Sequence, residues 1–244
     1  MENTAPAAAA VPAPADNPYG LYALWHDGGP IAQTTLIILL IMSAVSWYII
    51  FSKLWDQRRL RKGAKVVEKQ FWSSGSLKEA VDRLPKDSDF RAVAEDGLRA
   101  SAHHEGRLTD RIDLHEWVTM SLQRSVDAVN SKLSNGLAFL ATVGSTAPFV
   151  GLFGTVVGIL KALVNIGVSG QASIDKVAGP VGEALIMTAI GLFVAVPAVM
   201  GYNWLLRRNK SISESLRNFA SDLHAYLVGG ARVSQGAPVA GVKK

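Results

Sequence analysis

Three long stretches of the chain contain no Asp, Glu, Lys or Arg. They run from Ile31 to Ser52, from Leu133 to Leu160 and from Ala184 to Leu206. A helix needs about 20 residues to cross the apolar core of a bilayer, which is about 30 Å thick. Each stretch is long enough to do so. The pattern predicts a membrane protein with three transmembrane helices and excludes a water-soluble enzyme.

The polar segments between these stretches define the expected domain organisation. The tail 1–30 begins with an Ala/Pro-rich segment, so residues 1–18 are expected to be disordered. Then follow transmembrane helix 31–52, a helical domain over 53–132, transmembrane helix 133–160, a short loop over 161–180, transmembrane helix 181–206, and a C-terminal helix and tail over 207–244.

The basic residues predict the orientation of these segments. Residues 1–30 contain no Lys or Arg, whereas basic side chains cluster directly after the first and third stretches. Since Lys and Arg favour the cytoplasmic side, the N-terminus and the loop 161–180 are expected outside, and the domain 53–132 and the C-terminus inside. The same rule accounts for the net charge of +5, so nucleic acid is not expected as a partner.

The domain 53–132 shows helical periodicity and no extended strand-like alternation, so the fold class is all-α. Ser76 is predicted to cap a short helix, with Glu79 at the capping-box position. A further helix is expected over about 90–103. From about Thr109, apolar residues recur at helical spacing with no turn signal before Gly136. The second transmembrane helix is therefore expected to continue into the cytoplasm.

Candidate chemistry in this domain is sparse. The chain has no Cys, which removes disulfides and thiolate ligands. His103 and His104 are adjacent and point to different helix faces, and His115 has no evident companions. Solvent-exposed histidines, no metal site and no catalytic constellation are therefore expected.

Small residues set the second and third transmembrane helices apart from the bulky, aliphatic first one. In lipid, small side chains let two helix backbones approach closely. One face of the second helix is lined by Ala141, Gly144, Pro148, Gly151, Thr155 and Gly158, and Gly154 forms a GxxxG motif with Gly158. One face of the third is lined by Ala184, Thr188, Gly191, Ala195 and Ala198, next to Pro197.

Three polar residues interrupt these apolar helices. In an antiparallel arrangement, Thr155 and Thr188 lie at similar depth; their hydroxyls either bond to carbonyls of their own helices or serve a polar site. Glu183 follows Pro180, where the third transmembrane helix is expected to begin. It is either an interfacial residue stabilised by the helix dipole or a functional intramembrane acid.

The residues of the last two membrane helices carry a family resemblance. The runs over 147–159 and 178–185, followed by 188–192 and 195–198, resemble the signature of the MotA/TolQ/ExbB proton-channel family. The likeness covers these two helices almost continuously, and the three-helix topology agrees with it.

The resemblance implies a pentamer in the bacterial inner membrane whose second and third helices surround the single helices of an ExbD-like dimer. That partner supplies the proton-carrying aspartate, whereas this chain supplies a polar surface of Thr155, Thr188, Glu183 and, near the cytoplasmic end, Asn203. It implies proton-driven work passed to TonB for uptake of iron–siderophore complexes and similar nutrients through outer-membrane receptors. No cofactor is expected, although a bound phospholipid is allowed.

Alternatives remain at this point. A TolQ-like role in the Tol–Pal envelope-maintenance system is the nearest, and a flagellar stator is more distant. A membrane scaffold and a secondary transporter belong to other classes, although no internal repeat supports the transporter. If the small residues form a smooth wall facing the partner, Gly151→Leu is expected to assemble but lose activity.

Overall fold

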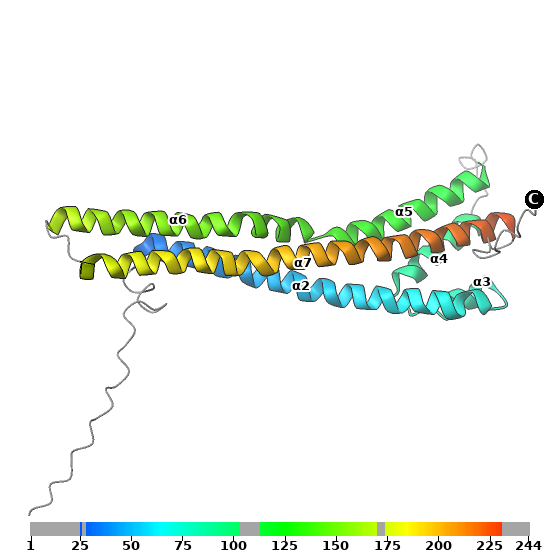
Figure 1. Ribbon diagram of the computed structural model, residues 1–244. Helices are drawn as coiled ribbons and strands as arrows, with labels where there is room; N and C mark the ends of the chain where they lie inside the picture. Colours follow the sequence, from blue (N-terminus) through cyan, green and yellow to red (C-terminus); the bar gives the residue numbers. More distant parts are fainter. Residues whose placement is uncertain (1–24, 26–27, 103–112, 170–173, 231–244) are drawn as a thin grey trace, which may run out of the picture. The chain divides into compact units, whose positions relative to one another are not determined.

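The computed structural model describes residues 25, 28–102, 113–169 and 174–230 (Figure 1). All regular secondary structure in this part of the chain is helical, and it contains no strand, which confirms the all-α prediction. Its elements are α2 (Gly29–Gln70), the 3₁₀ helix η1 (Phe71–Ser73), α3 (Leu77–Asp82), α4 (Asp89–Ala102), α5 (Leu114–Ser134), α6 (Leu137–Ser169) and α7 (Ile174–Gly229).

Three helical stretches are long and apolar enough to cross a membrane: Gly29–Ser73, Leu114–Val168 and Val177–Gly229. Each contains one of the charge-free windows, so the three predicted membrane helices are present. Their ends differ from the expected boundaries. α6 continues to Ser169 and α7 begins at Ile174, so most of the segment predicted as the loop 161–180 is helical.

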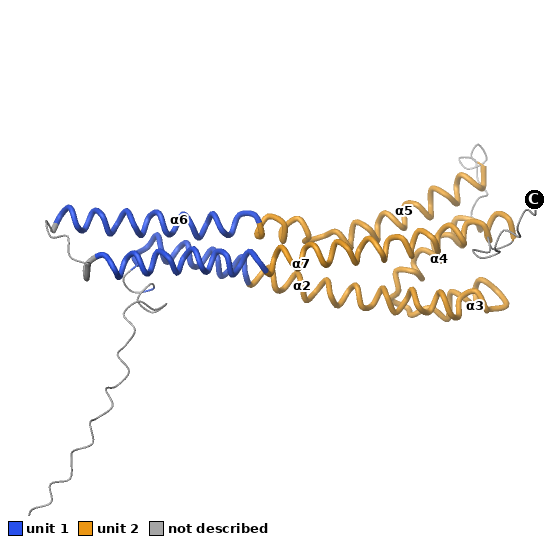
Figure 2. Tube along the Cα trace, in the orientation of Figure 1, with its two compact units in different colours: residues 1–43, 145–196 blue, residues 44–144, 197–244 orange. Residues whose placement is uncertain are grey.

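The chain divides into two compact units, and α2, α6 and α7 contribute to both (Figure 2). The first unit comprises residues 1–43 and 145–196, and the second comprises residues 44–144 and 197–244. The candidate site belongs to the first unit. The second unit holds the hydrophobic core of the predicted helical domain.

The core of the second unit is built around Phe219 of α7. Its ring lies edge-on to Phe71 of η1, with centroids 5.0 Å apart, and edge-on to Phe90 of α4 at 5.6 Å. All three rings are almost fully buried, and such aromatic pairs add about 0.5–1.5 kcal/mol beyond burial. α3 and α5 contribute Val81, Val118 and Leu122 to the same cluster.

The short helices of this unit begin as their sequences predict. The Glu79 backbone N–H donates to Ser76 Oγ at 3.3 Å, so Ser76 is the N-cap of α3. The Glu79 carboxylate forms an ion pair with Arg83 at 2.6 Å. The helix expected over 90–103 is α4. His103, His104 and Thr109 lie outside the described residues.

The long helix expected to join the second membrane span to the cytoplasmic domain is interrupted. α5 ends at Ser134 and α6 begins at Leu137. Between them Gly136 has φ +81°, a left-handed conformation that glycine adopts without penalty. A helix end leaves its last carbonyls without intrahelical donors, so this interruption must be compensated.

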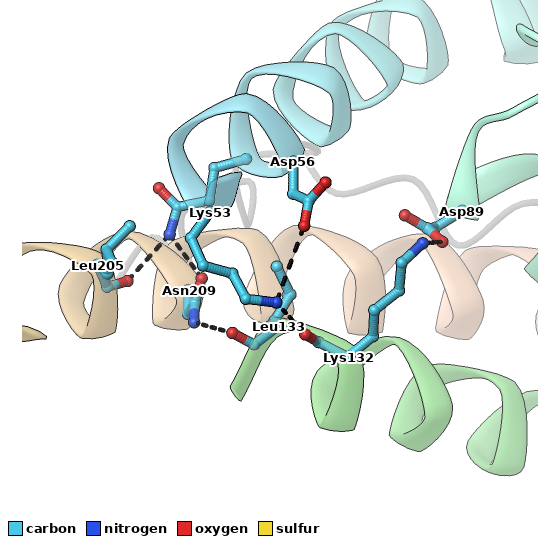
Figure 3. Close-up of polar contacts among 8 residues, drawn as sticks. Lys53, Asp56, Asp89, Lys132, Leu133, Leu205 and Asn209 are labelled. Carbon is cyan, nitrogen blue, oxygen red and sulfur yellow. Dashed lines mark hydrogen bonds and ion pairs between the residues drawn. The ribbon is translucent and has the colours of Figure 1, made fainter. Parts of the chain in front are cut away.

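Side chains from two other helices supply the missing donors (Figure 3). Lys53 Nζ of α2 donates to the Lys132 carbonyl at 2.7 Å. Asn209 Nδ2 of α7 donates to the Leu133 carbonyl at 2.9 Å. Gln57 of α2, which is fully buried, donates to Asn209 Oδ1 at 2.7 Å and so holds the amide in place.

This network predicts that Asn209→Ala is destabilising. The change leaves the Leu133 carbonyl and one Gln57 donor buried without partners, which costs about 1–3 kcal/mol. Thermal unfolding of the detergent-purified protein measures the effect. The matched control is Asn218→Ala on the same helix, where the side chain is exposed. Equal losses in both variants would contradict the capping role of Asn209.

Candidate functional site

The site begins where α6 and α7 touch backbone to backbone in the first unit. A Cβ atom placed on Gly151 would lie 2.6 Å from the Met187 carbonyl oxygen, and one on Gly191 would lie 2.7 Å from the Ala147 carbonyl oxygen. Both distances are shorter than side-chain carbons tolerate. Glycine at these two positions is therefore what allows the two helices to pack this closely.

The other small residues of the two predicted faces also serve packing within the chain. A Cβ atom on Gly158 would lie 2.9 Å from Ala184 Cβ, and one on Gly154 would lie 2.9 Å from Met187 Cε. Gly144 faces Val199 in the second unit. Among the remaining positions of this predicted set, Ala195 is buried and both Pro148 and Pro197 are half-buried.

Thr155 and Thr188 meet at this close contact. Their hydroxyl oxygens are hydrogen-bonded to each other, which confirms that the two residues lie at the same depth. Thr155 Oγ1 also lies 2.7 Å from the Ala184 carbonyl oxygen of α7 and 3.2 Å from the Gly151 carbonyl oxygen of its own helix. Thr155 is buried, whereas Thr188 is half-buried.

Hydrogen counting assigns directions to these bonds. Each threonine hydroxyl has one hydrogen and two acceptor lone pairs. If Thr155 donates to Ala184, the nearer carbonyl, Thr188 donates to Thr155. The Thr188 oxygen then keeps acceptor capacity toward its less buried side. If the Thr188 hydroxyl rotates, it presents its hydrogen on that side instead. The pair can therefore either accept a hydrogen bond from a neighbouring group or donate one to it.

Glu183 lies inside α7 rather than at its beginning. α7 starts at Ile174, more than two helical turns earlier. The dipole effect falls off within the first turn of a helix, so it does not account for this carboxylate. Glu183 is half-buried. The first of the two alternatives for this residue, an interfacial glutamate stabilised by the helix dipole, is therefore not supported by its position in α7.

The other polar candidates lie elsewhere. Asn203 belongs to the second unit and is exposed; its Nδ2 donates to the Val199 carbonyl of its own helix at 3.0 Å. The structure does not bring Asn203 together with the threonine pair. His115 is exposed on α5, as expected, and its ring contacts that of His224 edge-on at 4.5 Å.

Sequence reasoning missed Gln57 and Asn209, although the helical period held a signal for both of them. Asn209 follows Leu205 by four residues and precedes Ile212 by three, so it falls on the buried stripe of α7. A polar residue on such a stripe points to a buried partner. Gln57 carried the same signal, since it follows Ile50 by seven residues and precedes Leu60 by three, so it falls on the buried stripe of α2.

Comparison with known proteins supports the resemblance seen in the sequence. Residues 86–218 match the MotA/TolQ/ExbB proton channel family. The chain is 43% identical over 212 residues to biopolymer transport protein ExbB of Xanthomonas campestris, covering 83% of this chain and 84% of that protein.

Two further relatives show the breadth of the likeness. Biopolymer transport protein ExbB of Neisseria gonorrhoeae is 37% identical over 210 residues, covering 84% of this chain and 96% of that protein. The Tol-Pal system protein TolQ of Pseudomonas aeruginosa is 33% identical over 212 residues, covering 85% of this chain and 92% of that protein.

The close contact of α6 and α7 corrects the expectation for Gly151→Leu. That substitution was expected to leave assembly intact, but Gly151 faces the backbone of α7 in the same chain. Even Gly151→Ala forces the two backbones apart. Overpacking of this kind costs about 1–3 kcal/mol, so the protein is expected to melt at lower temperature and to be recovered in lower yield.

The matched control is Gly167→Ala in the same helix, where nothing lies within 4 Å of an added Cβ atom. Alanine is a better helix former than glycine, so this variant is expected to be neutral or slightly stabilised. Size-exclusion profiles and thermal unfolding in detergent compare the two. An unchanged unfolding midpoint for Gly151→Ala would contradict the packing argument.

Proposed function

The chain belongs to the MotA/TolQ/ExbB proton channel family, and we propose that it is an ExbB-type subunit of an inner-membrane motor driven by the proton-motive force. The two ExbB relatives named above cover more than four-fifths of the chain, at higher identity than the TolQ of Pseudomonas aeruginosa. In this role the protein transmits the energy of proton flow rather than catalysing a reaction. Its work is passed to TonB for uptake through outer-membrane receptors.

The observation that carries the proposal is the hydrogen-bonded pair of Thr155 and Thr188 between two apolar helices. A carboxyl group in hydrocarbon resists ionisation, because burial disfavours its charged form. A hydroxyl beside it stabilises the protonated acid by accepting a hydrogen bond and the carboxylate by donating one. The pair thus suits an aspartate on an ExbD-like partner that is protonated and deprotonated in turn.

The proposed assembly and orientation follow the family resemblance and the charge pattern. A pentamer places α6 and α7 of each subunit around the helices of the ExbD-like dimer. The N-terminus is periplasmic and the C-terminus cytoplasmic, since basic residues cluster after the first and third apolar stretches. Glu183 stands toward the periplasmic end of the predicted span 181–206, and Asn203 toward the cytoplasmic end of that span.

A TolQ-type role in the Tol–Pal system is the second candidate, favoured by the 33% identity to the TolQ of Pseudomonas aeruginosa. Native mass spectrometry after co-expression with the single-span protein encoded beside this chain tests both. A pentamer that retains a dimer of an ExbD-like partner supports the proposal. A monomer or dimer that ignores the partner overturns it, and selective retention of a Tol-type partner favours the second candidate.

Substitution of Thr188 by Val tests the hydroxyl pair. Valine keeps the shape of threonine but removes one hydrogen bond to the partner's carboxyl group, and hydrogen bonds to charged groups contribute about 1.5–3 kcal/mol. Proton flux through the reconstituted complex, followed by a pH-sensitive dye inside liposomes, is therefore expected to fall about tenfold or more.

The control for this prediction is Thr34→Val. Thr34 is exposed on α2, and its hydroxyl donates to the Pro30 carbonyl of its own helix, so flux is expected to be unchanged. Native mass spectrometry of both variants verifies that the complex still forms. Full proton flux in an assembled Thr188→Val complex would count against the proposed role of the pair.

A further inference from the structure

A basic groove of about 800 Å³ lies between α2 and α7 in the second unit. Of the six cationic side chains that line it, we call all but Arg59 the basic groove residues. They are Arg58, Arg61, Lys62 and Lys65 from α2, and Arg208 from α7. α2 and α7 are remote in sequence, so the cations are gathered by the fold and not only by the local composition of one segment.

The charge in this groove is not balanced by neighbouring acids. Glu68 is the sole acidic residue of its lining, and none of the basic groove residues forms an ion pair within the described part of the chain. Arg59, which also borders the groove, differs from them because it pairs with Asp87 at 2.6 Å. The groove therefore presents a surplus of positive charge.

Arg208 is the innermost member of the set. Its guanidinium lies 4.4 Å from the ring centre of Trp204, a cation–π contact. Its Nε atom is buried and has no hydrogen-bond partner among the described residues. Burial, followed by the charges of Arg61 and Arg58, lowers the pKa of Arg208 from its usual value. A buried donor without an acceptor, inside a positive field, is suited to an anion.

The position of the groove indicates which anion. It begins directly after two charge-free stretches, beside the exposed rings of Trp55 and Trp204. Trp side chains favour the headgroup region of a bilayer. If α2 and α7 span the membrane as proposed, the mouth of the groove opens at the level of the lipid phosphates.

We propose that this groove binds the phosphate group of an anionic phospholipid, held by Arg58, Arg61 and Arg208 with Ser211 as a further donor. Guanidinium groups match the geometry of phosphate oxygens and bind them through paired hydrogen bonds. Topology alone requires basic residues only near the membrane. It does not require them to converge from two helices on one cavity.

Native mass spectrometry of the full-length protein in detergent, titrated with phosphatidylglycerol or phosphatidylcholine, tests this site. The wild type is expected to retain phosphatidylglycerol preferentially. Each basic residue near an anionic lipid contributes about fivefold in affinity, so R61Q/R208Q is expected to lose about 25-fold. The control R124Q/R217Q removes the same charge from exposed positions on α5 and α7 and is expected to bind as the wild type does.

The variant R61K/R208K keeps the charge without the guanidinium forks and is expected to bind with intermediate affinity, which separates binding from misfolding. Equal loss in the two Gln variants, or equal retention of both lipids, would overturn the proposal. If millimolar inorganic phosphate displaced phosphatidylglycerol, the groove would be a site for a soluble anion, and the proposal that it binds a lipid would be wrong. The inference rests on the proposed membrane position and not on the motor function. If the protein bound the lipid but did not bind an ExbD-like partner, that result would count only against the motor function.

Discussion

Backbone carbonyls without hydrogen-bond partners are costly where water is scarce, and the interruption between α5 and α6 creates them. Gly136 turns the chain, and the carbonyls of Lys132 and Leu133 lose their intrahelical donors. The donors come instead from Lys53 of α2 and Asn209 of α7. The bond to Leu133 is buried, whereas the bond to Lys132 is exposed, so this break in a helix requires above all that α7 stand in register beside it. The packing of the second unit depends on that requirement.

The first unit meets a related constraint by a different route. α6 and α7 approach so closely at Gly151 and Gly191 that no side chain fits between them. This proximity brings the Thr155 hydroxyl within 2.7 Å of the Ala184 carbonyl on the opposite helix. The hydroxyl is thereby satisfied across the interface rather than only within its own helix. Small residues and threonines are thus parts of one arrangement, in which the glycines set the distance that the hydroxyls bridge.

Some of these features were predictable from sequence and others were not, for physical reasons. Absence of charge predicted the three apolar helices, and antiparallel geometry predicted that Thr155 and Thr188 share a depth. The same sequence could not show whether Gly151 faces its own chain or a partner, because small residues suit both contacts. Nor could it distinguish Gly136, which breaks a helix, from the glycines that only pack one. That difference is a backbone angle set by tertiary contacts with α2 and α7.

The choice of hydroxyls at the proposed proton site also has a physical basis. A carboxylate at position 155 or 188 would couple to the partner's acid, since two like charges a few ångströms apart shift each other's protonation strongly. A fixed cation would hold the partner's acid ionised. A threonine pair is neutral, and by rotating one hydroxyl it can solvate either protonation state. Such a surface lowers the cost of both states without favouring one, which is what an acid that must cycle requires of its surroundings.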